Sequence, residues 1–174
     1  MKRFLILLVL SVVPITAHAQ YEGIWEGYDG ELTHVTKQLI ELAEATPADK
    51  FAWRPGPGVR SFSEVYMHIA IANFYLLSTT GLKEPEVTLE MEKTVTAKAD
   101  VIDWLKRSLE AVKTARAGLK PGDLERKVKI QGKVVPVDGI YLRIIIHNNE
   151  HMGQLIAYSR VNGIVPPWSR TKPE

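Results

Sequence analysis

The chain contains no cysteine among its 174 residues. It therefore has no disulfide, no thiolate metal ligand and no cysteine nucleophile, and it cannot carry a lipid-modified cysteine anchor. Aromatic residues are also sparse, at 8% of the chain. Stability must come from an aliphatic core, from a bound metal, or from both.

A long hydrophobic run is missing as well, although the N-terminus is apolar. Lys2 and Arg3 precede an apolar stretch at 4–13, and the small residues of Ala-His-Ala follow at 17–19. This order is typical of a signal peptide, so we expect residues 1–19 to be cleaved and the protein to be exported, periplasmic or secreted. An uncleaved anchor is the alternative, but the stretch is shorter than the about 20 residues of a membrane span.

An excess of either charge is absent from the mature chain. The chain has 22 basic and 20 acidic residues, and the leader removes two basic residues and no acidic one. The remaining neutral chain has no basic stripe, so we expect no nucleic-acid partner and, after processing, no stable membrane anchor. Residues 20–174 suit a single domain with one core.

Four segments show the apolar periodicity of amphipathic helices, which predicts an all-α four-helix bundle. A small β-hairpin is expected before the last helix, with strands near 128–130 and 134–136. The connection at 82–96 is charged and interrupted by proline, and the sequence does not predict its structure. The four predicted helices cover about 28–45, 61–80, 100–119 and 138–162.

The second predicted helix carries a start signal and a histidine. Ser61 and Glu64 have the spacing of a capping box, which satisfies free N–H groups at a helix start. Counting about 100° per residue from His68 places Tyr75 on the inward face and Asn73 outside it. His68 is therefore expected among apolar neighbours.

Three histidines carry the clearest chemical signal. His147 and His151 are four residues apart, so on a helix they share one face, and His68 can reach the same core. Ordinary structural histidines are the alternative, but two adjacent inward rings would each need a hydrogen-bond partner. A divalent metal resolves this by accepting a lone pair from each ring. Zinc or nickel is expected, although nitrogen ligands also suit copper and iron.

Residues around these histidines are secondary candidates. His147 to His151 matches the H-x-x-E-H pattern of inverted zinc proteases, with Glu150 as general base, but too little chain follows for their further ligand. Gln154 and Tyr158 continue the histidine face and could bind substrate or orient a ring. Ordinary packing is the alternative for both.

Several short motifs together resemble the DinB-like superfamily, also known as the YfiT-like metal-dependent hydrolases, and especially its exported members. The resemblance covers nearly all of the mature chain. The matching motifs are Trp53-Arg54-Pro55, Gly58, Ser61, His68-Ile69-Ala70, His147, His151-Met152-Gly153-Gln154, Tyr158-Ser159-Arg160 and Gly163 through Pro166-Pro167.

The resemblance implies a four-helix bundle and a three-histidine divalent-metal site at His68, His147 and His151. It also implies hydrolysis, or group transfer with a small thiol such as bacillithiol, mycothiol or glutathione. These thiols are chiefly cytosolic, whereas this chain carries an export signal. A small-molecule substrate of unknown identity is expected. A non-catalytic, metal-pinned binding or interaction module remains the alternative, and a homodimer is compatible with either.

Overall fold

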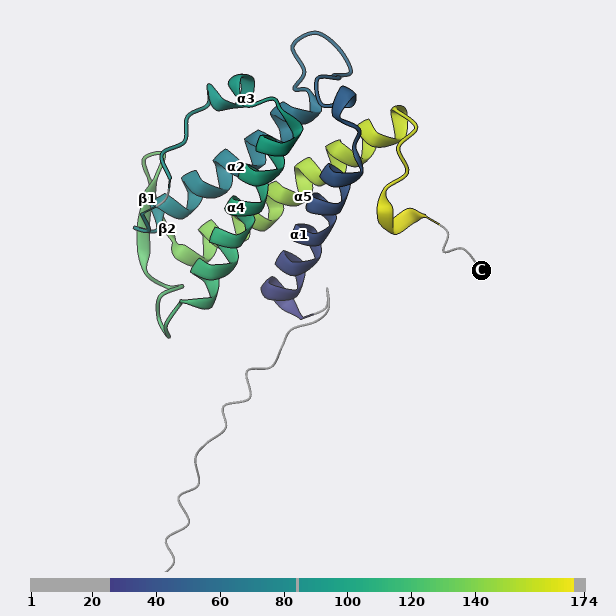
Figure 1. Cartoon of the computed structure of the whole chain (residues 1–174). Coiled ribbons are helices and arrows are strands. Elements are labelled where there is room, and N and C mark those ends of the chain that lie inside the picture. The colour runs from purple at the N-terminus through teal and green to yellow at the C-terminus, as the bar shows by residue number, and fades with distance from the viewer. Residues whose placement is uncertain (1–25, 84, 171–174) are drawn as a thin grey trace, which may run out of the picture.

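Four long helices form the body of the protein, as the sequence predicts (Figure 1). The computed structural model describes residues 26–83 and 85–170, so the predicted signal peptide at 1–19 lies outside the described residues. The long helices are α1 (Gly27–Ala45), α2 (Phe62–Thr79), α4 (Lys98–Ala117) and α5 (Val137–Val161). The smaller elements are η1 (Ala48–Lys50), α3 (Met91–Thr94), β1 (Lys127–Ile130), β2 (Lys133–Pro136) and η2 (Pro167–Ser169).

Helix α2 begins at the predicted capping box. The Glu64 backbone N–H donates to Ser61 Oγ at 3.3 Å, and the Ser61 N–H donates to the Glu64 carboxylate at 2.8 Å. The Arg54 guanidinium also donates to that carboxylate at 2.9 Å. The loop before α2 is thereby fixed to the first turn of the helix that carries His68.

The core surrounds α2, which packs against both α4 and α5. Twelve of its 18 residues are buried, so the helix is apolar almost all round. The expectation that Asn73 lies outside the inward arc is wrong, because Asn73 is fully buried and donates to Ser108 Oγ on α4 at 3.3 Å. Tyr75, expected inward, is 45% exposed. A helix buried on most sides has no single inward arc.

The connection between α2 and α4 contains the short helix α3, which the sequence did not predict. Glu92 on α3 is buried, whereas Glu90, which precedes the helix, is exposed. The predicted hairpin is present as the antiparallel pair β1–β2. Its turn residues Gln131 and Gly132 have φ values of 47° and 77°, which suit a tight hairpin turn. Among the described residues, no helix is both long and apolar enough to cross a membrane.

The packing of α4 on α2 gives a stability prediction. Leu105 on α4 is fully buried, so Leu105→Ala should lower the free energy of unfolding by about 2–5 kcal/mol through lost burial and a residual cavity. Leu142→Ala on the exposed side of α5 is the control and should change it by less than about 0.5 kcal/mol. Urea unfolding of both variants measures the difference. Equal effects would contradict the packing described.

Candidate metal centre

The three predicted histidines meet between α2 and α5. His147 Nε2 lies 3.1 Å from His68 Nε2 and 3.2 Å from His151 Nε2. Suitable ligand atoms of all three rings lie within 4.8 Å of one another, and each residue is partly buried. His147 and His151 project from successive turns of α5, and His68 faces them from α2. Helical spacing thus aligns His147 with His151, and the packing of α2 against α5 brings the distant His68 to them.

The outer nitrogen of His68 is held by a buried carboxylate. His68 Nδ1 lies 2.7 Å from the Glu92 carboxylate, which also accepts a hydrogen bond from Arg60 Nε at 2.7 Å. Burial alone would raise the pKa of Glu92, but the hydrogen bonds from Arg60 and His68 lower it. An ionised carboxylate only accepts hydrogen bonds, so His68 Nδ1 carries the proton. In the neutral ring, the lone pair of His68 is then on Nε2, which faces the other two rings.

The outer nitrogen of His151 is held by a chain of hydrogen bonds that has one possible direction. Tyr158 OH donates to the Arg60 carbonyl at 3.1 Å, because a carbonyl can only accept. Tyr158 OH in turn accepts from Gln154 Nε2 at 2.7 Å. This orients the Gln154 amide so that its oxygen faces His151 Nδ1, at 2.9 Å. His151 Nδ1 is therefore the donor, and His151 Nε2 also presents a lone pair.

Tyr158 is itself held in place by aromatic packing. Its ring lies edge-on to Trp53, with centroids 5.3 Å apart, and to Phe62, with centroids 5.4 Å apart. These contacts fix the position of the hydroxyl that orients Gln154. The loop after η1 and the first turn of α2 thus contribute to the orientation of a histidine on α5.

His147 lies between the other two rings and is kept neutral. Burial, followed by the nearby His151 and His68, lowers its pKa from 6.5 to about 4. Burial also lowers the pKa of His151. The buried Nδ1 of His147 has no hydrogen-bond partner among the described residues. At neutral pH His147 and His151 are therefore uncharged, which is the protonation state that a metal needs.

The geometry of the inner nitrogens suits a divalent ion. Two nitrogens that bind one ion at about 2.0–2.1 Å lie about 2.8–3.4 Å apart for coordination angles between roughly 90° and 110°. Both observed Nε2 separations fall in this range. Without a cation, a single proton on His147 Nε2 would have to serve as the donor to both neighbouring Nε2 atoms. His68, His147 and His151 could therefore hold a divalent metal, and their nitrogens do not specify which one.

Of the three secondary candidates, the structure connects two to the histidine cluster by hydrogen bonds and places the third on the surface. Gln154 contacts His151 directly, and Tyr158 acts through Gln154. Glu150 lies on the exposed side of α5, where its carboxylate accepts from Arg143 Nη1 at 3.1 Å. Among the described residues, no hydrogen bond joins Glu150 to a histidine of the cluster. A catalytic role for Glu150, Gln154 or Tyr158 stays a prediction.

Sequence reasoning missed Glu92 and Arg60. Glu92 lies in the connection whose structure the sequence did not predict, 24 residues from His68. The only available signal was a cluster of glutamates at 84, 86, 90 and 92 within one charged segment. Nothing in that pattern distinguishes the buried Glu92 from Glu86 and Glu90, which are exposed.

Comparisons with known proteins agree with this fold. The sequence model of the DinB superfamily matches residues 31–155. The chain belongs to the DinB superfamily. The crystal structure of a DinB-like protein from Bacillus cereus ATCC 10987 is similar, with a TM-score of 0.68 and 23% identity, over 84% of this chain and 97% of that one.

A second crystal structure, of a DinB-like protein from Bacillus subtilis, has a TM-score of 0.63 and 17% identity. The match covers 83% of this chain and 99% of that one. At these sequence identities, the similarity of this DinB superfamily member to the two solved structures shows its fold and not its function. No protein of curated function matches the chain.

Glu92 gives the first prediction for the site. Glu92→Gln keeps the shape of the side chain but removes the charge that holds His68, so metal affinity should fall about 10- to 100-fold. Competition with a fluorescent chelator measures the dissociation constant. Glu90→Gln changes an exposed glutamate next to α3 and should leave the affinity unchanged. Equal affinities for the two variants would show that Glu92 does not support the site.

The depressed pKa of His147 gives a pH prediction for the metal-free protein. Between pH 6.5 and about 4 the unfolded chain binds a proton at His147 that the folded protein does not bind. Acidification through this window should therefore lower the free energy of unfolding. His147→Asn should make this dependence shallower, whereas His34→Asn, at an exposed position on α1, should keep it. Urea unfolding across the window measures both, and an unchanged slope in His147→Asn would contradict the assignment.

Proposed function

We propose that this protein is a divalent-metal-dependent hydrolase or thiol-type group transferase, with the ion held by His68, His147 and His151. One observation carries the proposal: the Nε2 atoms converge while Glu92 and Gln154 occupy the outer nitrogens of two rings. Such outer contacts fix ring orientation and tautomer in metal sites. The arrangement is pre-organised to bind a cation.

The three ligands are neutral, so they leave the positive charge of the ion uncompensated. A divalent ion held there would supply Lewis acidity, lowering the pKa of a water molecule or thiol and polarising a substrate oxygen. The protein itself holds the rings, excludes protons from His147 and keeps the Glu92 charge behind His68. Gln154 and Tyr158 act as positioning residues in this proposal.

The proposal includes export to the periplasm or the exterior. Its support is the order of basic, apolar and small residues in the first 19 positions of the sequence. Export would separate the protein from cytosolic thiols. Hydrolysis is therefore favoured over thiol transfer. Zinc and nickel remain the leading ions.

A non-catalytic role for the metal is the second candidate. It is favoured because the residues around the metal site come from three different helices. The ligands come from α2 and α5, and Glu92 reaches His68 from α3. An ion at this point would join three elements and stabilise the folded state by its binding energy. If the ion is only a structural pin, its removal should greatly lower the melting temperature. If it is catalytic, small anions and chelators should bind it without unfolding the protein.

His147→Ala tests the proposed function directly, because His147 lies between the other two ligands. We expect the variant to lose stoichiometric metal and any hydrolase or transferase activity, while circular dichroism still shows a helical bundle. Elemental analysis of untagged, chelator-free protein measures the metal, and His34→Ala on α1 is the matched control. Activity that survives in a metal-free His147→Ala variant would rule out the proposed mechanism.

A further inference from the structure

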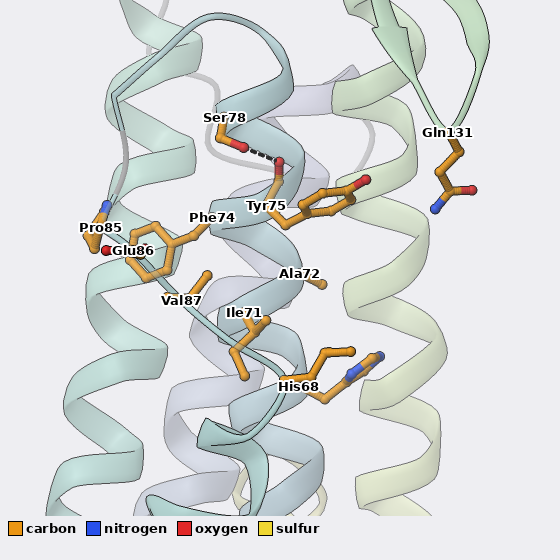
Figure 2. A pocket seen from close by; sticks show the side chains of 11 residues that line it. His68, Ile71, Ala72, Phe74, Tyr75, Ser78, Pro85, Glu86, Val87 and Gln131 are labelled. Carbon is orange, nitrogen blue, oxygen red and sulfur yellow. Dashed lines mark hydrogen bonds between the residues drawn. The ribbon is translucent and has the colours of Figure 1, made fainter.

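His68 lines an apolar cavity of about 680 Å³ (Figure 2). The same residue belongs to the histidine cluster, so the cavity lies beside it. This volume is in the usual range for sites that bind small molecules. Along α2, Ile71, Ala72 and Tyr75 follow His68 by three, four and seven residues. The helix face that carries the histidine therefore continues as the wall of the cavity.

The opposite walls come from two connecting segments. Val87 and Leu89 line the cavity from the connection between α2 and α4. Gln131, at the turn of the hairpin, lines it from the other side of Tyr75. Tyr75 and Leu89 are 45% and 71% exposed, so apolar surface remains open to a ligand. These segments enclose a space that begins at a predicted metal ligand and extends along α2.

The charge of the cavity limits what it can bind. Among the described residues that line it, Glu86 is the one carboxylate, and there is no lysine or arginine. Charged groups on the part of a ligand that lies away from the histidine cluster would lose hydration there without meeting a cationic side chain. A neutral, apolar group would instead be stabilised by contact with Ile71 and Tyr75.

A second cavity, on the other side of the cluster, is polar, and none of the three histidines lines it. It has a volume of about 620 Å³ and touches Glu92 and Gln154, which hold the outer ring nitrogens. Its arginines, Arg54 and Arg60, are already paired with carboxylates. The polar cavity therefore lies behind the rings, whereas the apolar cavity includes a ligand residue itself.

We propose that the apolar cavity is the substrate site and that the substrate is a small amphiphile. Its neutral aliphatic or aromatic part would lie along α2 between Ile71 and Tyr75, and one polar group would reach the histidine cluster. This inference rests on the proposed function, because the polar group needs the metal. It narrows the substrate class to small molecules with one polar end and a neutral, apolar remainder, and excludes molecules whose remainder carries several charges.

Hydroxamic acids test the proposal by binding alone, since their head group chelates a metal and their tail can be varied. Calorimetry on zinc-loaded protein would compare acetohydroxamic acid, octanohydroxamic acid and an analogue of the octanoyl compound with a terminal carboxylate. We expect the octanoyl compound to bind at least about tenfold more tightly than the acetyl compound, because its added methylenes are buried. The terminal carboxylate should remove most of that gain.

The outcomes separate the inference from the function on which it rests. If neither simple hydroxamate binds, the proposed open metal site is wrong and the inference falls with it. If both bind equally well, the metal site stands and the apolar substrate site is overturned. If the carboxylate analogue binds as tightly as the octanoyl compound, the preference for a neutral tail is overturned.

Substitutions inside and outside the cavity test where the octanoyl tail of the hydroxamate binds. Tyr75→Asp places a carboxylate in the cavity at a partly exposed position, so it should remove the octanoyl advantage and leave acetohydroxamate binding unchanged. Val161→Asp, at a position near the end of α5 that is 75% exposed and outside the cavity, should change neither affinity. An octanoyl advantage that persists in Tyr75→Asp would show that the tail binds elsewhere.

Discussion

The mutual approach of three imidazoles is the constraint on which the surrounding structure depends. Their inner nitrogens are 3.1 and 3.2 Å apart around His147, too close for each to find its own donor. Burial and proximity keep His147 from accepting a proton, since its pKa falls to about 4. A proton on His147 Nε2 could be shared with the other two Nε2 atoms, whereas a divalent cation accepts a lone pair from all three rings at once.

The elements around the three histidines hold the rings in place. The short helix α3 places the Glu92 carboxylate behind His68, and Arg60 keeps this carboxylate ionised. The aromatic contacts of Tyr158 orient Gln154 and thereby His151. A short helix and a group of aromatic contacts therefore set which ring nitrogen carries the proton in His68 and in His151. Solved relatives at 23% and 17% identity establish the bundle, while these contacts carry the argument for the site.

Much of the fold follows from local sequence patterns. The capping box fixed the start of α2, the Gln131-Gly132 turn predicted the hairpin, and helical spacing brought His147 and His151 onto one face. Periodicity failed for Asn73 and Tyr75 because α2 is buried on most sides, which leaves no single apolar arc to count from. Glu92 was beyond local reasoning, because its burial depends on how a charged connection folds over α2.

Anomalous X-ray scattering from crystals of the metal-loaded protein tests the central claim most directly. Data collected on both sides of the absorption edge identify the ion and locate it without assumptions about activity. The account predicts one ion per chain, bound by Nε2 of His68, His147 and His151, with Glu92 and Gln154 retained on the outer nitrogens. An ion at another position, or none after exposure to zinc, nickel and manganese, would contradict it.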